Sequence, residues 1–191
     1  LVSDMLDLAR KDAGRLELRR QSVDVEDVLL DCYERLVPGA DGRLRLQPPQ
    51  DEDCLPLASG DPERLAQCLV VLVDNALRYS PAPLPVRLAV EATPSSLVLH
   101  VLDRGPGVAP AERQAIFGRF VRGQAAVNTR GSGIGLAVVQ LLMEAMGGLV
   151  MVSDAPGGGA DFQLHLPLLE GRQVDPLQQR VAGDLIAEGL P

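Results

Sequence analysis

The stretch RGSGIGLAVVQLLMEAMGG, residues 130–148, constrains the fold most, because three glycines within five residues run directly into an apolar helical pattern. Glycines at a helix start let the backbone approach a ligand, and the unpaired N–H groups there, at the positive end of the helix dipole, attract phosphate. The stretch lacks the GK[ST] ending of a Walker loop, and no strand leads directly into it as in a dinucleotide-binding fold. Taken alone, it fits an anion site and a tightly packed loop equally well.

The rest of the chain alternates helical patterns with strand pairs. Helices are predicted at residues 24–36 behind Asp24 and Asp27, at residues 61–79 behind the N-cap Asp61 and Pro62, and at residues 110–120. Strands are predicted for RLELRR from Arg15, RLRLQ from Arg43, and two hairpins: PVRLAVEA with SLVLHVLD, and LVMVSDAP with ADFQLHLP. Because a regular βαβ rhythm is lacking, we expect a two-layer α/β sandwich whose mixed, mostly antiparallel sheet is covered by helices on one face.

Both ends of the chain carry helical patterns of their own. Residues 1–14 place apolar side chains at helical spacing, and residues 171–191 contain a short amphipathic pattern with Leu177, Val181 and Leu185 at i, i+4 and i+8. We therefore expect a globular body over residues 15–170 between a helix end and a tail. Because the chain begins at Leu1 in the middle of a helical pattern, we expect it to be part of a longer protein.

Composition removes several classes of function. The formal charge of -8 and the absence of a dense basic run argue against nucleic-acid binding. No uncharged run approaches the roughly 20 residues that cross a bilayer, so we expect a cytoplasmic domain, attached to a membrane only through segments outside this sequence. The histidines at 100 and 165 alternate with apolar residues, so we expect sheet histidines rather than ligands, and the cysteines at 32, 54 and 68, without CxxC spacing, read as reduced core thiols.

Three further segments, in a fixed order before residue 130, combine with the glycine-rich stretch. VDNALRYSP groups Asn75, Arg78 and Tyr79 at a helix end, and DRGPG places Asp103 at a strand end with glycines that leave room for a planar ring. IFGRFVR follows with Phe120. Each segment alone reads equally well as ordinary structure, but together they indicate a nucleotide pocket.

This set of segments resembles the catalytic ATP-binding domain of bacterial sensor histidine kinases, a branch of the Bergerat-fold superfamily that also contains gyrase, heat-shock chaperone and mismatch-repair ATPases. VDNALRYSP resembles the N box of that family, DRGPGVAP the first glycine box, IFGRFVRG the F box and GSGIGLAVVQLLMEAMGG the second glycine box. The N-terminal LVSDMLDLARKDAGRLEL resembles the last turns of the second dimerisation helix and the link that follows it. That segment favours the kinase branch.

The resemblance implies roles for individual residues and two cofactors, ATP and Mg²⁺. Asn75 would ligate Mg²⁺ through its amide oxygen, Asp103 would accept from the adenine amino group, and Arg122 would contact the γ-phosphate. Asn75, Arg78 and Arg122 would be the catalytic residues. The other residues expected to line the nucleotide are Tyr79, Gly105, Gly107, Phe120, Gly131, Ser132, Gly133, Gly135 and Leu136, with residues 121–130 as a lid.

Three positions depart from the family pattern: Val71, Ala160 and Met146, where MGG replaces the commoner HGG. Val71 stands one helical turn before Asn75, where many members have a second Asn and hydrolytic relatives have a Glu base. A valine cannot activate water, which argues against a gyrase-like ATPase, and the loss of a polar group there can weaken Mg²⁺ coordination. Ala160 replaces the hydroxyl residue that usually ends the late glycine loop.

Neither histidine has the setting of the phosphoacceptor histidine that the resemblance implies on the first dimerisation helix. Autokinase activity would therefore belong to the longer protein, a homodimer through its dimerisation helices, with transfer onward to an aspartate of a response regulator. Two alternatives stay open: a degenerate nucleotide-sensing or scaffolding module without kinase activity, and an anti-sigma-type serine kinase with the same pocket.

Overall fold

A five-stranded sheet is the centre of the computed structural model, which describes residues 16–49, 55–121 and 133–169. In spatial order its strands are β2 (Leu44–Leu46), β4 (Val86–Ala92), β5 (Ser96–Leu102), β7 (Ala160–Pro167) and β6 (Leu149–Asp154). β2 and β4 are parallel and every other pair is antiparallel, so the prediction of a mixed, mostly antiparallel sheet is confirmed. Both predicted hairpins are present, as β4 with β5 and as β6 with β7.

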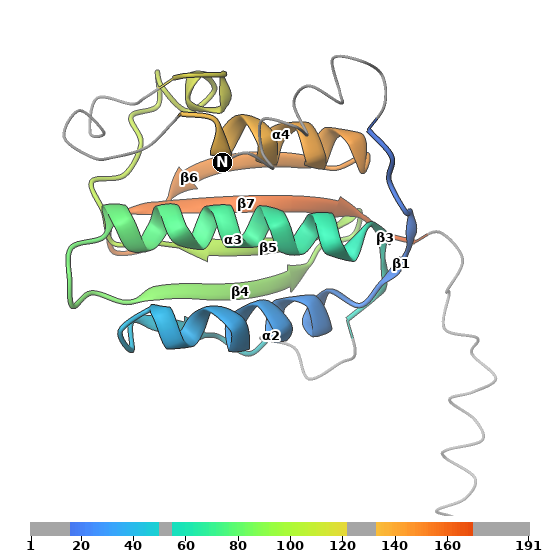
Figure 1. The fold of residues 1–191 in the computed structure, drawn as a ribbon, viewed down its shortest axis with the longest axis horizontal. Helices are drawn as coiled ribbons and strands as arrows, with labels where there is room; N and C mark the ends of the chain where they lie inside the picture. The colour runs from blue at the N-terminus through green and yellow to red at the C-terminus, as the bar shows by residue number, and fades with distance from the viewer. Residues whose placement is uncertain (1–15, 50–54, 122–132, 170–191) are drawn as a thin grey trace, which may run out of the picture.

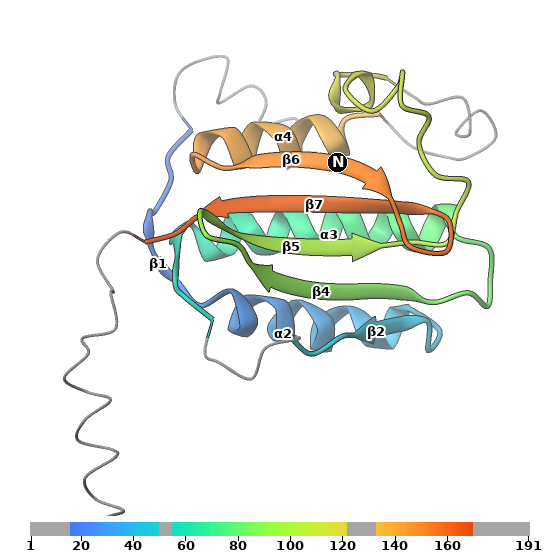
Figure 2. The same cartoon turned by 180° about the vertical axis from the view of Figure 1, so that it is seen from behind.

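The helices cover one face of this sheet, as Figures 1 and 2 show from opposite sides. They are α2 (Val25–Leu36), α3 (Pro62–Tyr79) and α4 (Gly135–Ala145), with short 3₁₀ turns η1 (Val37–Gly39) and η2 (Ala115–Phe117). Alternate residues of the strands, such as Leu88, Leu99 and Leu164, are fully buried against them. The predicted two-layer α/β sandwich is therefore confirmed. In none of the described ranges is a helix both long and apolar enough to cross a membrane.

The helix starts follow the predicted capping. Asp61 accepts hydrogen bonds from the backbone N–H groups of Glu63 at 3.1 Å and Arg64 at 3.2 Å, with Pro62 in the first turn of α3. Asp24 caps α2 in the same way. These caps satisfy N–H groups that would otherwise be unpaired, which explains why both helices begin where the sequence predicts.

Two short strands lie where the sequence predicts otherwise. The strand expected in RLELRR is instead β1 (Gln21–Val23), and it pairs antiparallel with β3 (Ala58–Gly60), in a segment expected to be a loop. Leu16 and Leu18 pack against the core but belong to no strand. Alternation of apolar residues did not locate this strand, because pairing depends on a partner far along the chain.

The helix predicted for residues 110–120 is also wrong in part. Residues 110–114 form turns, and only Ala115–Phe117 form a 3₁₀ helix, η2. Ile116 and Phe117 are buried, and Phe120 has a left-handed φ of 62° that an α-helix cannot continue through. Burial of two neighbouring apolar residues therefore decides the conformation here more than helix propensity does.

Cys32 and Cys68 are free and completely buried in the core. Burial raises the pKa of both thiols, which keeps them protonated and unreactive. Their prediction as reduced core thiols is confirmed. Cys54 lies outside the described residues, as do both terminal segments, residues 1–14 and 171–191.

Candidate functional site

The segments that the sequence singles out meet at one end of the molecule, on the left in Figure 1, where α3 ends and α4 begins. Glycines mark the contacts between these segments. A Cβ added to Gly105 would lie 2.9 Å from the carbonyl oxygen of Tyr79, and one added to Gly135 would lie 3.0 Å from Cγ1 of Val71. The C-terminal half of α3 therefore touches both glycine-rich segments, and no larger residue would allow these contacts.

A third contact joins the phenylalanine segment to the start of α4. The Phe120 N–H donates to the Gly133 carbonyl at 2.9 Å, and a Cβ on Gly133 would lie 3.0 Å from the Phe120 carbonyl carbon. Gly133 also has a left-handed φ of 68°. The Phe120 side chain itself is 70% exposed, so its backbone, and not its ring, makes this contact.

Three predicted site residues occupy the last turns of α3. The Arg78 guanidinium forms an ion pair with Asp74 at 2.7 Å, one turn earlier on the helix. The Asn75 side chain is half-buried, and we find no hydrogen bond to its amide among the described residues. Asn75 follows Val71 by one turn on the same face of α3, so it lies beside the contact with Gly135. Asp74 was not predicted as a partner of Arg78, although the i, i+4 spacing of the two residues on a helix is typical of an ion pair.

Asp103 is 5% exposed and follows the last residue of β5. Its Oδ1 accepts hydrogen bonds from the N–H groups of Gly105 at 2.8 Å and Ala160 at 2.9 Å, and its own N–H donates to the Ala160 carbonyl at 2.8 Å. In the described part of the chain, Oδ2 has no such partner. One carboxylate oxygen is thus held by the backbone while the other can accept a hydrogen bond from a ligand.

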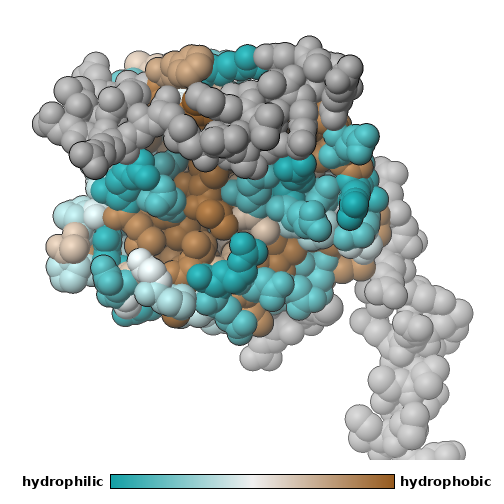
Figure 3. Space-filling model, in the orientation of Figure 1, coloured by the Kyte–Doolittle hydropathy of each residue, from teal (hydrophilic) through white to brown (hydrophobic). Residues whose placement is uncertain are grey.

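The start of α4 has no side-chain cap. Ile134 occupies the N-cap position and has no side chain that could accept from the first-turn N–H groups, in contrast to Asp24 and Asp61 on the other helices. Uncapped N–H groups at the positive end of a helix can bind an anion. Part of the surface over α3 is apolar within polar surroundings (Figure 3). Val71 of α3 and Leu136 of α4 are partly buried and pack against the core.

Comparison with known proteins decides the family. The profile of the histidine kinase-, DNA gyrase B- and HSP90-like ATPases matches residues 60–170, more than half of the chain. The chain belongs to this family. The match begins at the end of β3 and includes α3, Asp103 and α4, the segments that meet at the site.

Relatives of the chain include a sensor protein and a histidine-protein kinase/phosphatase. The sensor protein DivL of Caulobacter vibrioides is 39% identical over 167 residues, which are 87% of this chain and 21% of that protein. The histidine-protein kinase/phosphatase MprB of Mycolicibacterium paratuberculosis is 36% identical over 92% of this chain and 33% of that protein. A crystal structure of full-length ShkA in complex with AMPPNP has a TM-score of 0.73 and 34% identity, covering 89% of this chain and 36% of that chain. The chain thus spans a third or less of these two curated relatives.

Several predicted site residues cannot be located. Arg122, Gly131 and Ser132 lie outside the described residues, as does the predicted lid apart from Val121.

Gly107 is among the described residues. It has a left-handed φ of 74°, and a Cβ added there would lie 3.4 Å from the Gly159 carbonyl oxygen. The loop that contains Asp103 therefore packs against the turn between β6 and β7.

Two of the expected departures from the family pattern have structural counterparts. The Val71 side chain lies in the space that the missing Cβ of Gly135 leaves open, so this position makes an apolar contact. Ala160 has no hydroxyl group, but its backbone N–H donates to Asp103. The backbone at this position therefore orients the carboxylate without a hydroxyl side chain.

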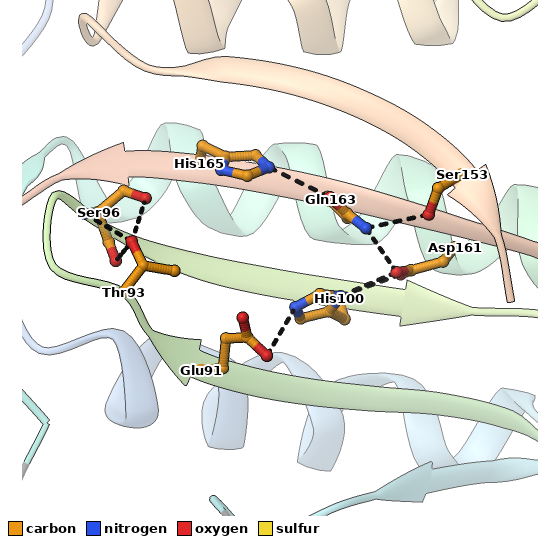
Figure 4. A network of polar contacts seen from close by, with 8 residues as sticks. All are labelled: Glu91, Thr93, Ser96, His100, Ser153, Asp161, Gln163 and His165. Atoms are coloured by element: carbon orange, nitrogen blue, oxygen red, sulfur yellow. Dashed lines mark hydrogen bonds and ion pairs between the residues drawn. The ribbon is translucent and has the colours of Figure 1, made fainter. Parts of the chain in front are cut away.

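The two histidines belong to a polar network on the sheet face that the helices leave open (Figure 4). His100 Nδ1 lies 3.1 and 3.0 Å from the two carboxylate oxygens of Asp161, and Nε2 lies 4.0 Å from Glu91. His165 Nε2 lies 3.3 Å from the amide oxygen of Gln163. Both side chains are on strands, as predicted, and both contact other side chains of the sheet.

The surroundings shift the pKa of these histidines in opposite directions. Burial lowers the pKa of His100, but the hydrogen bond to Asp161 and the charges of Asp161 and Glu91 together outweigh it, so the pKa is raised. Burial, followed by the charge of His100, lowers the pKa of His165. His100 Nε2 is buried and lacks a hydrogen-bond partner within the described residues. This fits a proton on Nδ1, between His100 and the Asp161 carboxylate.

Proposed function

We propose that this chain is the ATP-binding catalytic part of a sensor histidine kinase. It positions Mg-ATP so that the γ-phosphoryl group is transferred to a histidine of a dimerisation segment, formed in part by residues 1–14, and then to an aspartate of a response regulator. The observation that carries the proposal is the Asp103 carboxylate, with one oxygen held by two backbone N–H groups and the other open to a ligand. It lies at the end of the molecule where α4 begins without a side-chain cap.

The residues of the site fit a magnesium nucleotide. Oδ2 of Asp103 would accept from the adenine amino group. Gly105 and Gly107 let the loop that carries Asp103 pack closely against Tyr79 and Gly159, so the space beside them is filled by backbone and the expectation that they leave room for the ring is wrong. The first-turn N–H groups of α4 would bind phosphate oxygens. The amide oxygen of Asn75 is a hard ligand that no other described group occupies, so it suits Mg²⁺, and the ion when bound would neutralise phosphate charge.

Other assignments rest on the family. Arg78 and Tyr79 would face the phosphate and ribose, Phe120, Gly131, Ser132, Gly133, Gly135 and Leu136 would surround the nucleotide, and Arg122 would contact the γ-phosphate. The relatives support this assignment, because one carries histidine-protein kinase in its name and another was crystallised with AMPPNP. The dimeric state and the response regulator are proposals for the whole protein.

Calorimetric titration of this chain with Mg-ATP tests the proposal. Asp103→Asn keeps Oδ1 as an acceptor for both backbone N–H groups but turns the free atom into a donor, so it removes the adenine contact without disturbing the loop. We expect it to weaken binding at least tenfold, as loss of a hydrogen bond to a charged group does. Asn75→Ala should weaken Mg-ATP binding through the loss of the amide oxygen ligand.

Asp31→Asn, on the exposed face of α2, is the matched control and should bind Mg-ATP normally. If the unaltered chain binds neither Mg-ATP nor Mg-ADP, the proposal is wrong. Equal affinities of Asp103→Asn and the unaltered chain would remove the adenine assignment.

A second candidate function follows from Val71. An apolar residue one turn before the proposed Mg²⁺ ligand fits a module that binds nucleotide and relays a signal without chemistry. The longer protein that contains this chain, incubated with radiolabelled ATP, separates the two functions. A kinase acquires acid-labile phosphate on histidine, whereas a nucleotide-sensing module acquires none.

A further inference from the structure

Arg104 belongs to the DRGPG segment but has no role assigned to it above. It connects three segments around Asp103. Its backbone N–H donates to Oγ of Ser80, at the C-terminal end of α3, at 2.8 Å. Its guanidinium Nη1 donates to the carbonyl oxygens of Pro156 at 2.9 Å and Gly158 at 3.3 Å, in the turn between β6 and β7. Arg104 thus joins the end of α3, the loop after β5 and this turn.

The turn between β6 and β7 packs directly against Asp103. Ala160, directly after the turn, donates its N–H to Oδ1 of Asp103. A Cβ added to Gly159 would clash with the Asp103 carbonyl oxygen and lie 2.8 Å from Oδ1. The position of the carboxylate therefore depends on where this turn lies.

Two backbone hydrogen bonds close the turn, from the Gly158 N–H to the Ala155 carbonyl at 3.0 Å and from the Ala155 N–H to the Gly159 carbonyl at 3.1 Å, but its three glycines have no side chains that could hold it further. Gly157, Gly158 and Gly159 have φ angles of 84°, 95° and 98°, and glycine loses more backbone freedom than any other residue when it is held in one conformation. Arg104 restrains the turn from outside, because its guanidinium also packs over Gly157, where a Cβ would lie 2.5 Å from Nη1. Hydrogen bonds from a charged donor to carbonyl oxygens are stronger than neutral ones.

We propose that Arg104 is a positioning residue that sets the adenine selectivity of the site by holding the Gly157–Gly159 turn against Asp103. This inference rests on the proposed function, since it takes Asp103 as the adenine acceptor. With the turn held, Oδ1 remains bound to two N–H groups and Oδ2 points in one direction. Without Arg104 the turn moves, the carboxylate rotates, and the acceptor that distinguishes adenine from other purines loses its fixed place.

The test compares ADP with inosine diphosphate, which carries a carbonyl oxygen in place of the adenine amino group, by calorimetric titration in the presence of Mg²⁺. In the unaltered chain we expect ADP to bind more tightly than inosine diphosphate. Arg104→Ala should reduce this selectivity ratio about fivefold, mainly through ADP, as expected for the loss of partly exposed charge-assisted hydrogen bonds. Arg104→Lys, which keeps the charge but not the fork of donors, should retain an intermediate ratio.

Arg113→Ala is the matched control. Arg113 also bonds to this hairpin, at Asp154 with 2.6 Å, and to the Val108 carbonyl at 3.2 Å, but among the described residues no hydrogen bond or ion pair joins it to Gly157–Gly159, so its loss should leave the ratio unchanged. A selectivity ratio, unlike an affinity, is insensitive to a fraction of unfolded protein, and therefore separates positioning from folding. If Arg104→Ala is unfolded, Arg104→Lys still carries the test.

The outcomes are distinguishable. A selective unaltered chain with equally selective Arg104 variants overturns the positioning role and leaves the proposed function intact. An unaltered chain that binds neither ligand overturns both. One that binds both ligands equally overturns the role of Arg104 and the adenine assignment of Asp103, but not the binding of a magnesium nucleotide. A ratio that falls as much in Arg113→Ala as in Arg104→Ala also overturns the role of Arg104, because any disturbance of the hairpin would then suffice.

Discussion

Gly135 is the first residue of α4, although alanine has the higher helix propensity. A Cβ at this position would nevertheless lie 3.0 Å from Cγ1 of Val71, and a β-branched valine on a helix has little freedom to rotate away. At this position packing between two helices opposes helix propensity. The valine that departs from the family pattern is therefore also the residue that requires a glycine on the facing helix.

This contact predicts the outcome of a double-mutant cycle. Gly135→Ala should lower the free energy of unfolding by about 1 kcal/mol, the cost of overpacking by one methyl group, and should weaken Mg-ATP binding because it displaces the start of α4. Val71→Ala combined with Gly135→Ala should recover both, since the smaller side chain restores the space. Urea unfolding and titration calorimetry measure the two quantities. Additive losses in the double variant would contradict the contact.

His100 gives the residue scale a second prediction, about pH. Its pKa is raised by Asp161 of β7 and Glu91 of β4. The network continues from Asp161 through Gln163 to Ser153 and His165 (Figure 4). The folded state therefore binds the proton more tightly than the unfolded state. The stabilisation is fully present below the ordinary histidine value of about 6.5 and is lost as pH rises through the raised pKa.

We expect the free energy of unfolding of the chain to fall between about pH 6 and pH 8 by an amount that Asp161→Asn largely removes. His165→Gln is the control, because the lowered pKa of His165 contributes a slope of opposite sign, and its removal should keep or steepen the fall. Urea unfolding at a series of pH values provides the measurement. A slope unaffected by Asp161→Asn would show that His100 is not held by this pair.

At the scale of elements, the C-terminal end of α3 is held from outside the helix. The Arg43 guanidinium donates to the carbonyl oxygens of Leu77 at 3.1 Å, Ser80 at 2.9 Å and Leu84 at 3.0 Å. The last carbonyls of a helix have no partner within it, so Arg43 acts as a cap that also ties the following loop to α3. The residues proposed to contact Mg²⁺ and phosphate are on this turn.

Arg43→Ala should therefore lower the free energy of unfolding by about 1–2 kcal/mol, as for the loss of hydrogen bonds from a charged group. It should also increase amide hydrogen exchange in the last turn of α3 more than in its first turn. Arg45→Ala is the matched control, because exposed Arg45 bonds only to its neighbour Leu44 among the described residues, and should change stability by less than about 0.5 kcal/mol. Equal effects of both variants would argue against the cap.

At the scale of the whole molecule, the buried apolar side chains of the described residues form one cluster between the three helices and the sheet. The proposed site is built from both layers, with α3 and α4 on one side and the ends of β5 and β7 on the other (Figures 1 and 2). A ligand that contacts both layers binds the folded chain and not the unfolded chain. Binding should therefore stabilise the fold as a unit.

Mg-ATP at a concentration about 100 times its dissociation constant should raise the free energy of unfolding by about 2.7 kcal/mol, in one transition. Urea unfolding followed by circular dichroism, with and without Mg-ATP, measures this shift. Asp103→Asn, with an affinity at least tenfold lower, should show a shift of about 1.4 kcal/mol or less at the same concentration, whereas Asp31→Asn should show the full one. Stabilisation of Asp103→Asn to the same extent would indicate a binding site elsewhere.

Helix starts and hairpins depend on residues that are close together in the chain, and they could therefore be predicted from the sequence. Asp61 and Pro62 locate the start of α3 because a cap acts within one turn, and the alternation from Val86 to Leu102 predicts a hairpin because both strands and their turn are contiguous. The family was also predictable, since its motifs are short segments in a fixed order that the profile over residues 60–170 confirms.

Only the tertiary structure decided the contacts between distant segments. The pairing of β1 with β3, the packing of Val71 on Gly135, and the carbonyl partners of Arg43 and Arg104 join segments that no local pattern connects. Every residue has a backbone carbonyl and every glycine lacks a Cβ, so the sequence does not identify which of these groups a distant side chain will contact. Which arginine bonds to which carbonyl is therefore settled when the helices and the sheet pack together.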